Sequence, residues 1–231
     1  MFKPNHIYEI VKCQIDHRVF NPTRRAALRP QSRTLLQISE DHFAILIIGN
    51  DWRNKGVPVL LDALSKMASL PVCLVIVSGE ELSRCRKIIR EKGLDSRVRL
   101  LPPRQDVEFY YAAADVYVGP SLQDSYSLPP AEAMACGMPV IVSASAGVSE
   151  IITHEVDGLV LDDPTNAEKL ASMILRLYKD REFGLRLGMR ANKTAQKYTW
   201  ENNGRKLAAI FDDILQRKSP SISKAQCAKE I

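Results

Sequence analysis

Short apolar runs of strand length alternate along the chain with longer segments in which apolar residues recur three and four positions apart. The apolar runs are Phe43–Ile48, Val72–Val77, Val98–Leu101, 116–118, 140–142 and Leu159–Leu161. The segments with helical spacing between them are 57–68, 80–92, 107–114 and 128–136. Apolar runs without polar alternation predict strands buried on both faces, as in a parallel sheet covered by helices. The pattern therefore predicts an α/β fold with a doubly wound, Rossmann-like parallel sheet.

The two ends of the chain have a different character. After residue 163 the pattern is helical throughout and predicts helices over 166–179, 181–197 and 201–216. Residues 1–40 are weakly patterned and contain Pro4, Pro22 and Pro30. We therefore expect four parts: a lead-in at 1–40, a Rossmann-like core at 41–163, C-terminal helices at 164–217 that pack on the core, and a flexible tail at 218–231.

Composition and charge narrow the class of protein. With 45% apolar and 26% charged residues in a chain of 231, a soluble globular protein is expected. The net charge of +5 suits either a solvated surface or a polyanionic ligand, and without an aromatic-rich basic stripe it does not indicate nucleic acid. Five cysteines without a CxxC pair favour free or buried thiols. No leader or membrane-length apolar run is seen, so we expect a cytoplasmic protein.

The loop after the first predicted strand has a composition suited to an anion. It runs from Gly49 to Gly56 and contains Arg53 and Lys55 just before a predicted helix. Helix amides and these cations would act on an anion together, although a solvated turn would have the same sequence. The loop matches neither the dinucleotide fingerprint nor the Walker pattern, which disfavours NAD-type and P-loop chemistry.

The loop after the fourth predicted strand carries two carboxylates. Asp124 lies in the loop, and Glu132 follows within the next helix. Two prolines at 129 and 130 fall in the first helical turn, where they are tolerated but supply no amide proton. The amides of Ser127 and Leu128 are left to meet a phosphate, while Ser127 could equally be an N-cap.

These residues carry a resemblance to a known family. The run at 120–141, PSLQDSYSLPPAEAMACGMPVI, is similar to the signature of the retaining glycosyltransferases that include sucrose and glycogen synthases and many bacterial mannosyl- and glucosyltransferases. In that signature two acidic residues, here Asp124 and Glu132, are separated by seven that include an aromatic–glycine–leucine, and the second acidic residue begins the run EAMAxGxPV. Residues 13–22 resemble the family's interdomain segment, 49–56 its phosphate loop, and 147–151 and 157–159 its later motifs, so that the similarity covers roughly 13–216.

The resemblance implies a role for each part of the site. The family has a GT-B fold, in which two Rossmann-like domains enclose the active site, and this chain resembles the second, donor-binding domain preceded by an interdomain remnant. Lys55 and Arg53 would neutralise the diphosphate, Glu132 would accept hydrogen bonds from the ribose hydroxyls, and Asp124 would lie beside the sugar ring. Gly49 and Asn50 would belong to the phosphate loop, Ser127 and Leu128 would offer amides, and Arg104 with residues 101–104 would line the base.

The resemblance also implies partners. The donor would be a nucleotide-diphosphate sugar, used for polysaccharide or glycolipid synthesis with retention of configuration and without a metal or other cofactor; the chain has no DxD motif. An N-terminal acceptor-binding domain, missing or on a separate chain, would complete the enzyme and would carry any peripheral membrane association, and without it we expect no transfer. Asn50, Asp124 and Ser127 stand where the family usually has Arg, Glu and Gly. These departures favour a non-catalytic sugar-nucleotide-binding or regulatory relic as the alternative. Another GT-B enzyme, such as an epimerase, is a second rival, which the segment at 13–22 and the spacing of Asp124 and Glu132 argue against.

Overall fold

The computed structural model describes residues 15–218 of the chain. The start of the segment at 13–22 lies outside the described residues, as do Cys13 and Cys227. The tail predicted at 218–231 also lies outside them except for Lys218, which is the last residue of a helix. Cys73, Cys85 and Cys136 are free and buried, as the cysteine pattern predicted. Burial raises the pKa of these thiols to about 11, 11 and 12, respectively.

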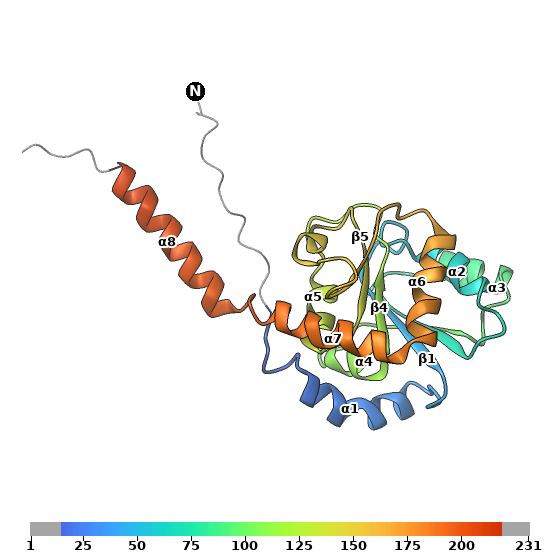
Figure 1. Ribbon diagram of the computed structural model, residues 1–231. Coiled ribbons are helices and arrows are strands. Elements are labelled where there is room, and N and C mark those ends of the chain that lie inside the picture. The colour runs from blue at the N-terminus through green and yellow to red at the C-terminus, as the bar shows by residue number, and fades with distance from the viewer. Residues whose placement is uncertain (1–14, 219–231) are drawn as a thin grey trace, which may run out of the picture.

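Six parallel strands form one sheet with the order β3-β2-β1-β4-β5-β6 (Figure 1). The strands are β1 (Phe43–Ile48), β2 (Val72–Val77), β3 (Val98–Leu101), β4 (Val116–Gly119), β5 (Val140–Ser143) and β6 (Leu159–Leu161). The strand order reverses between β1 and β4, which pair through Ile45 and Val116. This is the doubly wound, Rossmann-like topology that the apolar runs predicted.

Helices cover both faces of the sheet. They are α1 (Pro22–Leu35), α2 (Val57–Ser65), α3 (Ser83–Glu91), α4 (Glu108–Ala113), α5 (Leu128–Ala135), the 3-10 helix η1 (Gly147–Ile151), α6 (Ala167–Lys179), α7 (Arg181–Ala195) and α8 (Trp200–Lys218). Successive residues of β1 enter different cores: Ile45 packs in a cluster with α2, α3 and α6, and Leu46 packs in a cluster with α4 and α5. Both faces are therefore buried, because side chains alternate along a strand.

Helix α1 was not indicated by the sequence pattern of the lead-in. It begins at Pro22, a position where the missing amide proton is harmless, and the side chain of Asn21 accepts a hydrogen bond from the Arg24 amide. Pro30 lies inside the helix. Its inward face includes Arg33, of which only 1% is exposed, so the usual apolar stripe of a packed helix is missing.

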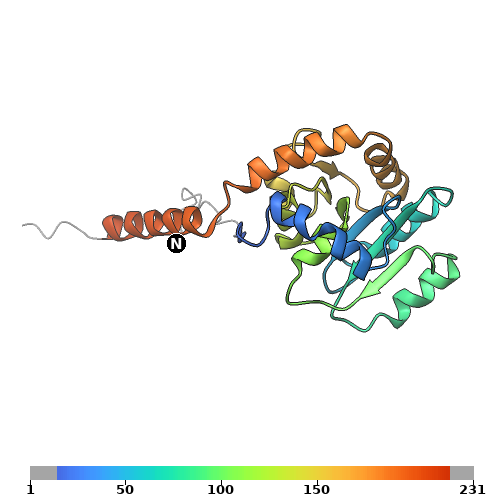
Figure 2. The same cartoon turned by 90° about the horizontal axis from the view of Figure 1, so that it is seen from below.

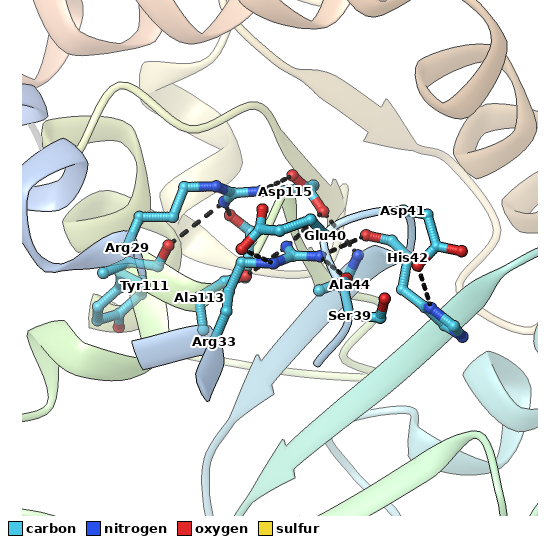
Figure 3. Close-up of polar contacts among 12 residues, drawn as sticks. Arg29, Arg33, Ser39, Glu40, Asp41, His42, Ala44, Tyr111, Ala113 and Asp115 are labelled. Atoms are coloured by element: carbon cyan, nitrogen blue, oxygen red, sulfur yellow. Dashed lines mark hydrogen bonds and ion pairs between the residues drawn. The ribbon is translucent and has the colours of Figure 1, made fainter. Parts of the chain in front are cut away.

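Arginines of α1 hold the helix against the end of α4. Arg25 Nη2 donates to Ala114 O at 2.7 Å, and Arg33 Nη1 donates to Ala113 O at 3.0 Å. Arg29 and Arg33 also contact Asp115, as Figure 3 shows. The last carbonyls of a helix lack partners within it and form the negative end of its dipole. Guanidinium groups spaced four residues apart donate hydrogen bonds to these carbonyls and bring positive charge to the negative end of the dipole.

Helix α8 projects away from the body of the molecule (Figures 1 and 2). Several of its large apolar side chains are exposed, among them Trp200 at 62%, Phe211 at 56% and Leu215 at 64%. No helix within residues 15–218 combines the length and apolar character needed to cross a membrane. More than half of the surface of each of these three α8 side chains is therefore open to solvent.

Candidate functional site

The candidate site lies where the loops that follow β1 and β4 leave the carboxyl ends of two adjacent strands. Ligands of doubly wound folds bind at this edge, next to the reversal of strand order. The β1–α2 loop contains Gly49, Asn50, Arg53 and Lys55, and the β4–α5 loop contains Asp124 and Ser127. The topology thus brings both predicted loops to one edge of the sheet.

Two glycines permit close contacts at this edge, Gly56 between the two loops and Gly49 within the β1–α2 loop. Gly56 has a φ of 77°, and a Cβ atom there would lie 2.0 Å from the carbonyl oxygen of Pro120. Gly49 has a φ of 150°, and a Cβ atom there would lie 2.7 Å from Lys55 Cε. A side chain at Gly56 is therefore excluded unless the two loops move apart, whereas a side chain at Gly49 is disfavoured by the positive φ and would displace the end of Lys55. The stem of Lys55 consequently lies over Gly49.

Lys55 and Asp124 meet across the two loops. Lys55 Nζ lies 2.5 Å from Asp124 Oδ2, and the side chains are 19% and 12% exposed. The contact joins residues 69 positions apart. A partly buried lysine beside an exposed edge of the sheet is a cation that an anionic ligand could reach, once it competes with the carboxylate.

Hydrogen bonds to main-chain carbonyls hold the β4–α5 loop on both sides. Leu122 N donates to Asn54 O at 2.7 Å, and Asn54 Nδ2 donates to Gln123 O at 2.8 Å. On the other side, Gly147 N donates to Asp124 O at 3.1 Å, and a Cβ atom on Gly147 would lie 2.1 Å from Ser125 O. The backbone around Asp124 is thus positioned before any ligand binds.

Ser127 precedes α5 in an unusual backbone conformation. Its φ is 69° and its ψ is 95°, and its side chain makes no capping hydrogen bond. The serine therefore occupies the N-cap position without acting as a side-chain cap. Pro129 and Pro130 supply no amide proton in the first turn, so the amide of Leu128 remains as a donor at the start of the helix. Conformations of this kind at non-glycine residues are concentrated at functional sites.

Glu132 lies one turn into α5 and is held by a buried tyrosine of α4. Tyr111 Oη donates to Glu132 Oε2 at 2.5 Å, and Tyr111 is fully buried. Burial raises the pKa of Glu132, and the hydrogen bond from Tyr111 opposes that rise. Burial and the neighbouring Glu132 also raise the pKa of Tyr111 well above its usual value, so the tyrosine stays a donor. This leaves Oε1 of Glu132 as an acceptor for another group.

The other predicted binding residues have contacts of their own. Asn50 Oδ1 accepts from Gly79 N at 3.0 Å. The exposed Arg53 lies over the ring of Trp52, with 5.0 Å between Cζ and the ring centroid. Arg104 forms two hydrogen bonds with Asp106, each of 2.8 Å.

The Lys55–Asp124 pair is therefore the central contact of the site, and three of the other predicted binding residues are not bonded to it. Within residues 15–218, no hydrogen bond or ion pair joins Arg53, Arg104 or Glu132 to the Lys55–Asp124 pair. In the same part of the chain, no three His, Cys, Asp or Glu side chains are grouped so that they could hold a metal ion. Tyr111 and Asn54 were missed by sequence reasoning, because their contacts join distant positions that no local motif relates.

A family model and the curated relatives that match the chain both indicate glycosyltransferases. The family model described as glycosyl transferases group 1 matches residues 29–196. A D-inositol 3-phosphate glycosyltransferase from Corynebacterium kroppenstedtii is 30% identical over 231 aligned residues, which cover 95% of this chain and 50% of that protein. The chain spans about half the length of the curated relatives it matches.

Solved structures agree in fold. The sucrose-phosphate synthase of Thermosynechococcus elongatus matches with a TM-score of 0.78 and 26% identity, over 90% of this chain and 52% of that one. HepE from Anabaena, solved in complex with UDP-glucose, matches with a TM-score of 0.77 and 23% identity, over 87% of this chain and 56% of that one. Each known structure is thus matched over about half of its length.

Proposed function

The chain belongs to the group 1 glycosyl transferases, and from that premise we propose that it is the donor-binding half of a retaining, metal-independent enzyme. The donor is a nucleotide-diphosphate sugar. The Lys55–Asp124 contact carries this proposal, because it places a cation and a carboxylate where the loops of β1 and β4 meet. HepE, a fold neighbour, has been solved with UDP-glucose, which supports the same class of donor.

The diphosphate would bind between the two loops. Lys55 exchanges its contact with Asp124 for the phosphate oxygens, and Arg53 turns from the Trp52 ring to assist. The amides of Ser127 and Leu128 meet the same anion at the start of α5, where a helix dipole favours negative charge. Gly49 leaves space for the Lys55 side chain, and Asn50 connects the β1–α2 loop to the loop after β2 by accepting a hydrogen bond from Gly79 N.

The nucleoside and the sugar occupy opposite sides of the diphosphate. Glu132 accepts hydrogen bonds from the ribose hydroxyls through Oε1, while Tyr111 holds Oε2. Arg104 and the loop at 101–104 lie beside the base. Asp124, released from Lys55, faces the sugar ring, where positive charge develops as the bond from the anomeric carbon to the diphosphate oxygen breaks.

The chemical contribution of this half is stabilisation of the leaving group. Cations and amides that are already in place can stabilise charge as it develops on the diphosphate, without reorganising at the moment of reaction. The acceptor hydroxyl then forms the new bond to the anomeric carbon on the face that the diphosphate leaves, and its proton passes to the departing phosphate oxygen, so that configuration is retained. Because Lys55, Arg53 and the helix amides neutralise the diphosphate, the scheme requires no metal.

Transfer requires a second domain that binds the acceptor. The chain spans about half the length of its curated relatives, and α8 carries exposed apolar residues on a helix that leaves the body. Such a surface supports docking of a further domain, on this chain or another. Any peripheral contact with a membrane would be made by that domain.

Calorimetric titration with UDP-, GDP- and ADP-sugars tests the proposal on the chain and on Lys55→Ala and Glu132→Ala. Loss of a charge-assisted hydrogen bond is worth about 1.5–3 kcal/mol, so each variant should bind the accepted donor about tenfold to a hundredfold more weakly. Lys92→Ala is the matched control, since Lys92 Nζ also lies 2.5 Å from a carboxylate, that of Asp62, outside the site. Unchanged binding in Lys55→Ala would place the donor elsewhere.

The second candidate is a relic that binds a sugar nucleotide, or nothing, without transfer. It is favoured by Asn50, Asp124 and Ser127, which depart from the family pattern in the two loops that form the site. Absence of binding across the whole donor panel would support this reading.

A further inference from the structure

A cavity of about 350 Å³ lies at the opposite edge of the sheet from the candidate donor site. Its lining includes Phe43, the first residue of β1, and Asp115, which immediately precedes β4. A strand rises about 3.3 Å per residue, so the six residues of β1 separate this cavity from the carboxyl-end loops by roughly 20 Å. The cavity is therefore distinct from the site of the Lys55–Asp124 pair.

The lining of the cavity is rich in arginine. Arg25, Arg29 and Arg181 contribute to it, and Asp115 is its one carboxylate, which leaves a formal charge of +2 on the lining. Asp115 is already shared between Arg29, whose Nη2 lies 2.7 Å away, and Arg33 behind the wall. The charges of Arg25 and Arg181 thus have no carboxylate partner within the described part of the chain.

The arginines of α1 have a structural role, but Arg181 does not share it. Arg25 donates to Tyr111 O and Ala114 O, which accounts for two of the five N–H groups of its guanidinium. Burial and the neighbouring Arg29 lower the pKa of Arg25, because both disfavour its positive charge. An added anion would stabilise that charge. Arg181 lies over the rings of Phe43 and Tyr178, at 4.5 and 5.5 Å from their centroids. These ring contacts leave its N–H groups available.

Apolar side chains form the rest of the wall. Phe43, Pro139, Leu177 and Leu185 line the same cavity as the arginines. Ligand pockets combine apolar walls with a few convergent polar groups, and 350 Å³ lies at the small end of their usual volumes. The volume suits a compact molecule with an anionic group and a small apolar body.

We propose that this cavity binds a small phosphate monoester, with the phosphate between Arg25 and Arg181 and the organic group against Phe43 and Leu177. The dianion matches the charge of the lining, and guanidinium groups donate paired hydrogen bonds to phosphate oxygens. The site is independent of the proposed donor site and of glycosyl transfer.

Titration of the intact chain with phenyl phosphate tests the proposal. We expect saturable binding, weaker binding of inorganic phosphate because it lacks the apolar group, and at least tenfold weaker binding of phenyl phosphate to Arg181→Gln. Arg186→Gln is the matched control, because Arg186 lies on the same helix but outside the cavity and pairs with Glu182. Thermal melting checks that each variant is folded.

The donor-site variant Lys55→Ala distinguishes the two sites. Phenyl phosphate should bind Lys55→Ala and the unaltered chain equally. Binding lost in Lys55→Ala but kept in Arg181→Gln would assign the anion to the carboxyl-end loops and overturn the proposal. Absence of binding to the intact chain, or equal binding by Arg181→Gln and Arg186→Gln, would also overturn it.

Discussion

Lys55 Nζ and Asp124 Oδ2 lie 2.5 Å apart, so that a cation from the loop after β1 contacts a carboxylate from the loop after β4. Each side chain satisfies the other when no ligand is bound. An anionic ligand must therefore displace one member of the pair, and its binding is coupled to a rearrangement of Asp124. The relationship depends on the close approach of the two loops, which can be tested directly.

Gly56→Ala should destabilise the fold. A methyl group at this position would meet the Pro120 carbonyl at 2.0 Å in a backbone with a φ of 77°. Moving the two loops apart and straining the backbone should cost more than about 2 kcal/mol, measured by urea unfolding. Gly93→Ala is the control, because φ there is 65° but no atom lies within 4 Å, and only about 1 kcal/mol of conformational cost is expected. Equal losses in both variants would mean that the loop contact is unimportant.

Tyr111→Phe should impair recognition of the ribose. It removes the hydrogen bond that orients Glu132 Oε2, while keeping the ring that fills the core. Loss of one such bond is worth about 0.5–1.5 kcal/mol, so binding of the nucleoside diphosphate should weaken by a factor of about 2 to about 13.

The ratio of the affinities for the ribonucleotide and its 2′-deoxy analogue distinguishes a role of Tyr111 in positioning Glu132 from a general loss of structure. In Tyr111→Phe this ratio should shrink, because the misplaced carboxylate no longer favours the ribose hydroxyls. Tyr110→Phe is the matched control, since that adjacent tyrosine donates to Pro102 O at 2.6 Å and not to Glu132. A ratio unchanged in both variants would make Tyr111 a packing residue only.

The strands could be predicted closely from the sequence because both faces of the sheet are buried. Four of the six observed strands have the predicted bounds, and β4 and β5 are one residue longer. Helix ends were less accurate: the segment at 57–68 forms a helix only over Val57–Ser65, since Lys66 to Leu70 turn toward β2. Burial on both faces leaves a continuous apolar run, whereas a helix end depends on local hydrogen bonds.

Helix α1 could not be predicted from apolar periodicity. Its contact with α4 is made by guanidinium groups such as those of Arg29 and Arg33, which donate to carbonyls (Figure 3). The candidate site likewise has a part that could be predicted from the sequence and a part that could not. The loops of Lys55 and Asp124 could be predicted, since loops after parallel strands share one edge of the sheet. The contact of Tyr111 with Glu132 could not, because it depends on how α4 and α5 pack.

Glu132→Gln should change the pH dependence of stability. Burial raises the pKa of Glu132 in the folded state, so the folded form binds its proton more tightly than the unfolded chain does. The contribution of Glu132 is therefore greatest below its unfolded pKa of about 4.3 and is lost as pH rises through the folded pKa. As pH rises from 4 to 7, the free energy of unfolding of Glu132→Gln, measured with urea, should increase relative to that of the unaltered chain.

Glu155→Gln provides a control of opposite sign for this pH series. The Arg176 side chain lowers the pKa of Glu155, so the favourable contribution of Glu155 appears as pH rises. Glu155→Gln should therefore lose stability relative to the unaltered chain from pH 4 to pH 7. If both variants changed in the same direction, burial of Glu132 would not be the cause.

Ser127→Gly should stabilise the fold. Serine is strained at a φ of 69°, at a cost of about 1–3 kcal/mol, whereas glycine adopts this conformation freely and loses about 0.5–1 kcal/mol of chain entropy. A net gain of about 1 kcal/mol is expected in urea unfolding. Ser125→Gly, in the same loop without a positive φ, should lose stability instead. A loss of stability in Ser127→Gly would show that the strain is absent.

Arg33→Met should be the most destabilising of these substitutions. The Arg33 guanidinium is buried, donates to Ala113 O and to two further carbonyls, and contacts Asp115 Oδ2 at 3.4 Å. Methionine fills much of the space but supplies no donor to these carbonyls and takes one cation from Asp115, which keeps Arg29. Removal of one partner from a buried ion pair costs about 3–5 kcal/mol.

Urea unfolding of Arg33→Met is compared with that of Arg18→Met. Arg18 also pairs with an aspartate, Asp16, at 2.8 Å, but its side chain is 90% exposed, and an exposed pair contributes about 0–1 kcal/mol. The two substitutions remove the same groups and differ in burial. A loss in Arg33→Met no larger than that in Arg18→Met would mean that water satisfies the carbonyls that Arg33 leaves, and that Arg25 and Arg29 suffice to hold α1 against α4.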